Sequence, residues 1–281
     1  MAAVVVMTLG GQRWQSGAVK RVLTAVVAVP LFAWLVSRGP AWLFVALVLA
    51  VGALAVWELM RMFEGAGQPV YPGLAVALTI LVLTTFATGS FSAQTAALCL
   101  AIGLLLSAPA FSRRPPATEP AALTLAGVLY IGWFLGHSVA LYRLAEGPEL
   151  ILLLAGVTWV GESAAYLIGS AIGRHKLAAT ISPRKTLEGA AAQLVGSALG
   201  ALILATWLTP QWPWSRALLA GALVGVVGQV GDLAESAMKR AVGVKDTGGL
   251  IPGHGGVLDR VDGLLFNVPA FYYYVLLTGR A

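Results

Sequence analysis

The sequence predicts an all-α, polytopic integral membrane protein with about nine transmembrane helices. The first two features that favour this class are the high share of hydrophobic residues, which gives a high mean hydropathy, and the low share of charged residues. Of the 281 residues, 58% are hydrophobic and only 11% are charged, and the mean hydropathy is +0.84. Such values exclude an ordinary soluble globular protein. The third feature is the grouping of the apolar residues into runs that approach the roughly 20 residues needed to cross a bilayer as a helix.

Nine such runs follow one another along the chain. The expected spans cover residues 19–37, 41–63, 72–90, 92–111, 122–143, 150–173, 189–208, 215–240 and 264–279. The first run follows basic residues, as a signal peptide would. However, no small-residue cleavage pattern precedes the next run, so a retained anchor is expected. The eighth run becomes polar toward its C-terminal end, and this part is expected to leave the hydrocarbon.

The chain divides into three regions by its chemistry. Residues 1–111 hold four spans with almost no internal charge. The exception is Glu58 and Arg61, whose i, i+3 spacing on one helix favours an ion pair at the membrane interface. Residues 112–148 hold a Pro-rich linker and the fifth span, where a contact between two copies of the chain is expected. Residues 149–281 hold spans six to nine, two polar loops and nearly all the chemically active side chains.

The basic residues are distributed unevenly between alternate loops. With the N-terminus in the cytoplasm and nine spans, 14 of the 18 Lys and Arg residues fall on the cytoplasmic side and 4 on the other. This asymmetry follows the positive-inside rule and places the polar loops of the third region in the cytoplasm. It also explains the net charge of +6 without a nucleic-acid partner. Cys99 is the only cysteine, so one chain forms no internal disulfide.

All four aspartates lie in one 31-residue window, which also contains a glycine-rich loop. Carboxylates can hold a metal, cations can meet phosphate, and glycines let backbone N–H groups approach an anion. These are the requirements of phosphoryl or nucleotidyl transfer. A solvated loop with incidental ion pairs is the alternative interpretation. The candidate residues in this window are Asp232, Lys239, Arg240, Lys245, Asp246, His254, Gly255, Gly256, Asp259, Arg260 and Asp262.

Helical spacing predicts how these residues are arranged. Asp232, then Glu235 or Ser236, and Lys239 recur at i, i+3 or i+4, and i+7, so they share one face at the end of the eighth helix. Asp259 and Asp262 are three residues apart and share a face at the start of the ninth. Aspartates from two helix ends could therefore converge on Mg²⁺, which prefers carboxylate oxygens together with substrate phosphates.

Two further features lie near the sixth span. The polar loop that follows it contains Ser182, Lys185 and Thr186 in a Ser-Pro-x-Lys-Thr segment leading into a helix. Hydroxyls, a lysine and free helix N–H groups suit phosphate, although positive-inside anchoring explains basic residues equally well. Glu162 lies inside the span itself, and a carboxylate at membrane depth is a functional candidate. A structural pair with a loop lysine is the alternative.

The window 236–262 reads Ser-x-x-Lys-Arg-x4-Lys-Asp-x-Gly-x-x-Ile-Pro-x-His-Gly-Gly-x-x-Asp-Arg-x-Asp. This long pattern closely resembles the signature of the phosphatidate cytidylyltransferases, also called CDP-diacylglycerol synthases. Further similarity covers most of the chain and lies in Lys20-Arg21, Trp57-Glu58, Leu129-Tyr130, the Ser182–Thr186 segment and Glu188-Gly189.

The resemblance implies the reaction CTP + phosphatidate → CDP-diacylglycerol + pyrophosphate, with Mg²⁺ and room for a second cation. It further implies a homodimer in a bacterial inner membrane, with the active site on the cytoplasmic side. Metal roles are implied for Asp232 and Asp259, with Asp246 and Asp262 close by. The residues expected around CTP are Glu162, Ser182, Lys185, Thr186, Gly255 and Gly256.

Two departures from the family pattern stand out. Glu162 occupies a position that is commonly aspartate, and Leu187 stands where an aromatic residue is often found. The longer side chain leaves the role of Glu162 open.

Two other functions fit the same residues. A CTP-dependent lipid kinase of the polyprenol kinase type would use the same metal and loop but transfer the γ-phosphoryl group, so its products differ. An ion-coupled transporter would bind its coupling cation with the aspartates. The loop position of the cluster and the lack of Gly/Pro-broken helix pairs near the midplane argue against transport.

Overall fold

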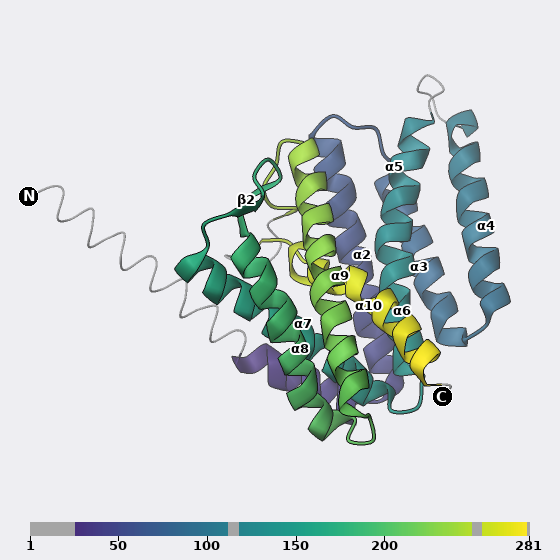
Figure 1. Ribbon diagram of the computed structural model, residues 1–281. Coiled ribbons are helices and arrows are strands. Elements are labelled where there is room, and N and C mark those ends of the chain that lie inside the picture. The colour runs from purple at the N-terminus through teal and green to yellow at the C-terminus, as the bar shows by residue number, and fades with distance from the viewer. Residues whose placement is uncertain (1–25, 112–117, 249–254, 280–281) are drawn as a thin grey trace, which may run out of the picture.

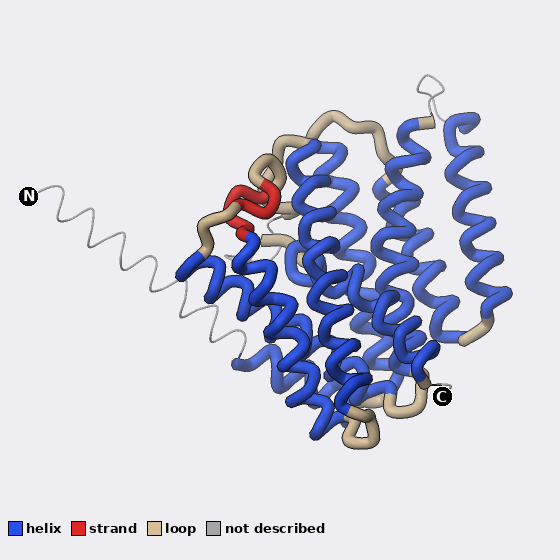
Figure 2. The backbone as a smooth tube through the Cα atoms, in the orientation of Figure 1, coloured by secondary structure: helices blue, strands red, loops and turns tan. Residues whose placement is uncertain are grey.

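The computed structural model describes residues 26–111, 118–248 and 255–279, which form a bundle of helices with one small hairpin (Figures 1 and 2). The predicted all-α membrane fold is confirmed. The helices are Val26–Arg38, α2 (Ala41–Gly65), α3 (Pro72–Thr88), α4 (Phe91–Ser107), η1 (Ala108–Phe111), α5 (Glu119–Gly127), η2 (Val128–Trp133), α6 (Phe134–Tyr142), α7 (Gly147–Ile172), α8 (Leu187–Leu208), α9 (Trp214–Ala241) and α10 (Leu258–Thr278).

Within these ranges, seven helices are long and apolar enough to cross a membrane, by length and composition. Two shorter apolar helices, Val26–Arg38 and α3, correspond to the remaining expected spans. The chain is therefore an integral membrane protein, while the number of nine spans stays a prediction. The last helix starts at Leu258, six residues before the expected span. Asp259 and Asp262 therefore lie in its first turns, at the start of the helix as predicted.

One span contains a π-helical segment. α5, η2 and α6 follow one another without a break from Glu119 to Tyr142, and η2 is the π-helical part. Wider turns of this kind often occur at functional sites. Tyr130 of η2 packs its ring 5.9 Å, between centroids, from that of Phe266 on α10. The wider turn therefore contacts α10 one helical turn beyond Asp262.

The loop after α7 folds into an antiparallel hairpin of β1 (Lys176–Ala178) and β2 (Ser182–Thr186). The sequence predicts only a polar loop here. β2 runs directly into α8, and the Thr186 hydroxyl accepts the N–H of Gly189 at 3.2 Å as the helix N-cap. The cap fixes Lys185, the residue before it, at the start of α8.

Helices α7, α8, α9 and α10 pack against one another in succession (Figure 1). Small residues let helices in a membrane approach closely. At Gly221 of α9, a Cβ atom would lie 2.4 Å from the carbonyl oxygen of Ser197 and 2.7 Å from Cα of Ala198. The backbones of α8 and α9 are therefore in direct contact.

We expect Gly221→Leu to lower the free energy of unfolding by about 1–3 kcal/mol, the usual cost of overpacking. Backbone atoms of α8 occupy the space, so the two helices must separate to admit the side chain. Thermal unfolding of the detergent-purified protein, followed by circular dichroism, measures the effect. Gly103→Leu is the matched control, because a Cβ at Gly103 meets nothing within 4 Å. Equal melting temperatures for the two variants would contradict the close packing.

Candidate metal and nucleotide site

One end of the bundle collects the polar residues. The hairpin, the C-terminal end of α9 and the start of α10 lie there (Figure 1). Arg240 joins two of these parts, since its guanidinium donates to the carbonyl of Ile181 at 3.2 Å and to that of Val244 at 2.9 Å. The predicted candidate Arg240 therefore holds the hairpin against the end of α9.

Three carboxylates from two helices meet at this end. Asp232 and Glu235 of α9 and Asp262 of α10 each offer an oxygen within 4.8 Å of the others. Glu235 is 1% exposed, and no hydrogen-bond donor from the described ranges reaches its Oε1. Carboxylates this close repel one another, so the acid cluster (Asp232, Glu235 and Asp262) is suited to a cation.

Lys239 connects the acid cluster to Asp259. Its Nζ lies 2.8 Å from Oε2 of Glu235 and 2.9 Å from Oδ1 of Asp259. Asp259 also accepts the N–H of Thr247 at 3.1 Å and that of Gly256 at 2.9 Å. Its oxygens thus meet a lysine and two backbone donors, and Asp259 ties both ends of the connecting loop to α10. The expected metal roles of Asp232 and Asp259 stay predictions.

Glu58 holds the same loop, which corrects the expected pair between Glu58 and Arg61. Arg61 pairs instead with Glu64 at 2.7 Å. Glu58 is 3% exposed, and its Oε2 accepts the N–H of Leu258 at 2.8 Å. A Cβ at Gly256 would lie 2.5 Å from that oxygen, so the loop closes over Glu58 only with glycine at this position. The carboxylate of α2 therefore meets a free N–H at the start of α10.

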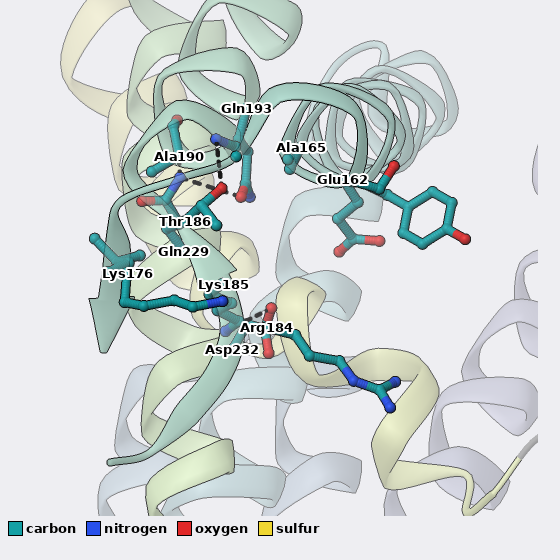
Figure 3. Close-up of a pocket in the computed structure, with 16 residues that line it drawn as sticks. Glu162, Ala165, Lys176, Arg184, Lys185, Thr186, Ala190, Gln193, Gln229 and Asp232 are labelled. Atoms are coloured by element: carbon teal, nitrogen blue, oxygen red, sulfur yellow. Dashed lines mark hydrogen bonds and ion pairs between the residues drawn. The ribbon is translucent and has the colours of Figure 1, made fainter. Parts of the chain in front are cut away.

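A cavity of about 490 Å³ adjoins the acid cluster through Asp232 (Figure 3). Its lining comes from α7, the hairpin, α8 and α9. Lys176, Arg184 and Lys185 supply positive charge, and Nζ of Lys185 lies 2.7 Å from Oδ2 of Asp232. Cations of the hairpin and a carboxylate of the acid cluster therefore line the same cavity, and Lys185 pairs directly with Asp232.

Glu162 lines this cavity from α7 (Figure 3). A Cβ at Gly263 of α10 would lie 2.3 Å from its Oε1, so the carboxylate rests against α10 beside Asp262. Glycine at position 263 is the residue that leaves room for this approach. The longer acidic side chain noted in the sequence therefore reaches the edge of the acid cluster.

The remaining predicted residues lie in different surroundings. Thr186 lines the cavity, whereas Ser182 pairs with Ala178 in the hairpin and is not part of the lining. Lys245 and Asp246 are exposed after α9, and Arg260 is exposed in the first turn of α10. His254 lies outside the described residues. Gly255 has a φ of +81°, a conformation that favours glycine.

Sequence patterns miss two residues of the site and leave the role of a third open. Glu235 is predicted only to share a helix face with Asp232 and Lys239, and the structure shows that it completes the acid cluster. Gln193 and Gln229 line the cavity, but each stands in an apolar run without a local pattern. Only the packing of α8 against α9 brings them together.

Comparison with known proteins identifies the class to which this fold and site belong. The chain is a member of the cytidylyltransferase family, whose model matches residues 19–278.

Relatives that carry a specific name are similar over nearly their whole length. The phosphatidate cytidylyltransferase of Bacillus subtilis (strain 168) is 34% identical over 264 residues, which cover 92% of this chain and 97% of that protein. The phosphatidate cytidylyltransferase of Synechocystis sp. is 33% identical, covering 92% and 96%. That of Staphylococcus haemolyticus is 34% identical, covering 89% and 95%. The family predicted from the motif is confirmed.

We expect Glu58→Leu to loosen the start of α10, because the N–H of Leu258 loses its buried acceptor at a cost of about 1–3 kcal/mol. Hydrogen–deuterium exchange followed by mass spectrometry should then be faster in peptides covering the first turns of α10. Glu64→Leu removes only an exposed ion pair and serves as the control. Unchanged exchange in Glu58→Leu would contradict this capping role.

Proposed function

We propose that this chain catalyses CTP + phosphatidate → CDP-diacylglycerol + pyrophosphate. One observation carries the proposal: the acid cluster shares Asp232 with a cavity lined by Lys176, Arg184 and Lys185. Carboxylates that can hold a metal, placed beside cations that can meet phosphates, are what nucleotidyl transfer requires. Membership of the cytidylyltransferase family and the names of the relatives support the same reaction.

The acid cluster fits a magnesium ion by its donor chemistry. Mg²⁺ prefers carboxylate oxygens together with substrate phosphates, and Oε1 of Glu235 is buried without a donor from the described chain. Asp232, Glu235 and Asp262 would hold the ion. When bound, it neutralises charge on the reacting phosphates. A second cation, and a ligand role for Asp246 or Asp259, stay predictions.

The protein's own residues act mainly by positioning. A phosphate oxygen of phosphatidate forms a bond to the α-phosphorus of CTP, while the bond from that phosphorus to the bridging oxygen breaks. The electron pair leaves with pyrophosphate. The phosphate monoester is already largely ionised near pH 7, so no strong general base is needed. Lys176, Arg184 and Lys185 hold the triphosphate and stabilise the charge on the leaving pyrophosphate. Lys239 fixes Glu235 against Asp259.

The lipid substrate approaches from the other side of α9. A mostly apolar cavity of about 340 Å³ lies there, lined among others by Leu59, Tyr130, Met238 and Phe266. Met238 follows Glu235 by three residues, and Phe266 follows Asp262 by four, so both lie within about one helical turn of the acid cluster. We place an acyl chain of phosphatidate in this cavity, with its phosphate toward the carboxylates.

The membrane setting follows from the same arrangement. We assign the hairpin end of the bundle to the cytoplasm, where CTP is found, and the protein to a bacterial inner membrane, since the relatives named above come from bacteria. Lys176, Arg184, Lys185, Lys239 and Lys245 all lie at this end, as the positive-inside rule favours. The expected homodimer stays a prediction.

The first experiment uses CTP labelled either at the α-phosphate or at the γ-phosphate. Purified protein with phosphatidate and Mg²⁺ should move an α-phosphate label, and not a γ-phosphate label, into a lipid-extractable product. We expect Asp262→Asn to lower this rate by at least about 100-fold, because it removes a charge that supports the transition state. It should also raise the Mg²⁺ concentration needed for half-maximal rate.

Glu149→Gln is the matched control, since Glu149 stands in the first turn of α7, at the end away from the hairpin. It should retain the wild-type rate. Transfer of the γ-label to lipid would establish a kinase instead. No transfer of either label, with metal-dependent cation flux in vesicles, would establish transport.

Sidedness can be measured with single cysteines. In a Cys99→Ser background, Pro183→Cys marks the exposed hairpin and Gln211→Cys marks the exposed turn between α8 and α9. We expect a membrane-impermeant maleimide to label Pro183→Cys only in inverted vesicles and Gln211→Cys only in intact spheroplasts, because the two lie at opposite ends of α8. The reverse pattern would contradict the assigned orientation.

A further inference from the structure

Two glutamines from neighbouring helices meet in the wall of the cavity. Gln193 of α8 and Gln229 of α9 both line it, on the side away from the lysines of the hairpin (Figure 3). Nε2 of Gln229 donates to the carbonyl oxygen of Ala190 at 2.9 Å and to Oε1 of Gln193 at 3.2 Å. Gln193 is 8% exposed. Gln229 is half-buried, and such amides are costly to place among apolar helices unless their groups find partners.

The hydrogen bonds fix which way each amide faces. The carbonyl of Ala190 only accepts, so the NH₂ group of Gln229 must point toward it. The other proton of that NH₂ then requires the oxygen of Gln193 rather than its nitrogen. One backbone carbonyl therefore sets the orientation of both side chains.

This arrangement leaves one donor and one acceptor for a ligand. The NH₂ group of Gln193 and the carbonyl oxygen of Gln229 have no hydrogen-bond partner in the described part of the chain. Both side chains line the cavity, so its wall offers one free amide donor and one free amide acceptor. A planar group with the complementary pair of atoms can satisfy both.

Cytosine carries that complementary pair on one edge. Its exocyclic N4 amine donates and its ring N3 accepts, so N4–H matches Oε1 of Gln229 and N3 matches Nε2 of Gln193. Uracil has the opposite pattern, with an O4 acceptor and an N3–H donor at the same places. In the same position, uracil would place its O4 against Oε1 of Gln229 and its N3–H against the NH₂ group of Gln193.

We propose that Gln193 and Gln229 read the cytosine base and make the site selective for a cytidine nucleotide over a uridine nucleotide. This inference rests on the proposed use of CTP. The cavity divides accordingly, with the amide pair at the base end and Lys176, Arg184 and Lys185 at the triphosphate end (Figure 3). A site built on paired hydrogen bonds rejects a mismatched ligand strongly, because its own buried groups are then left unpaired.

The decisive variant is Gln193→Glu. The carboxylate keeps an oxygen to accept from Gln229 but replaces the donor to N3 with a second acceptor. We expect kcat/KM for CTP to fall about 100-fold, mainly through KM, while kcat/KM for UTP does not fall. The dependence on Mg²⁺ and the KM for phosphatidate should stay as in the wild type.

Gln193→Met serves as a second variant, since an apolar side chain of similar length avoids a buried charge. It should lower CTP use and bring the CTP-to-UTP preference close to one. Gln68→Glu makes the same charge change in the turn between α2 and α3, away from the cavity, and should leave the preference unchanged. Equilibrium dialysis of labelled CTP and UTP with each purified variant measures selectivity without turnover.

The results separate this inference from the proposed reaction. Wild-type protein that binds CTP selectively, and loses selectivity in both Gln193 variants, supports the base-reading pair even if no cytidylyl group is transferred. Unchanged selectivity in both folded variants, with cytidylyl transfer intact, overturns the base-reading pair and leaves the reaction standing. Equal binding of CTP and UTP by the wild type overturns it as well.

Discussion

The ammonium group of Lys239 lies between carboxylates from two helices, 2.8 Å from Glu235 and 2.9 Å from Asp259. Taking carboxylates out of water is costly unless a partner compensates them. Lys239 is that partner for α9 and α10 together, since its own backbone belongs to α9 and Asp259 belongs to α10. Asp259 extends the connection to the loop through Thr247 and Gly256. The position of Asp262 beside Glu235 depends on this junction.

The loop between α9 and α10 is held from a third direction by Glu58. A carboxylate from α2, 200 residues earlier in the chain, accepts the N–H of Leu258. The first half of the protein therefore contributes to the geometry of a site whose other residues lie in the second half. The N-terminal helices therefore do more than anchor the chain in the membrane. Through Glu58 they fix where α10 begins, and hence the position of Asp262.

Sequence patterns predict the helices and much of the site, but not all of its contacts. Apolar runs place most helices to within a few residues, and the start of α10 to within six, because membrane burial imposes a strong constraint on length and composition. The common face of Asp232 and Lys239 follows from helical spacing. Contacts between distant segments are not predicted in this way. Glu58 shows local spacing only to Arg61, and its true partner depends on the packing of α2 against α10. Gln193 and Gln229 are likewise joined only by tertiary structure.

Because β2 passes directly into α8, that helix sets the spacing between two residues proposed to bind the ligand. Lys185 is the last residue before the cap, and Gln193 stands seven residues beyond Thr186 on the same helix. At 1.5 Å per residue the cap and Gln193 are separated by roughly 10 Å along the axis. A rigid helix therefore fixes the distance between the lysine proposed to bind phosphate and the amide proposed to read the base. Inserting one residue in this stretch would turn Gln193 by about 100° away from Gln229, so the proposed recognition depends on the length of this segment.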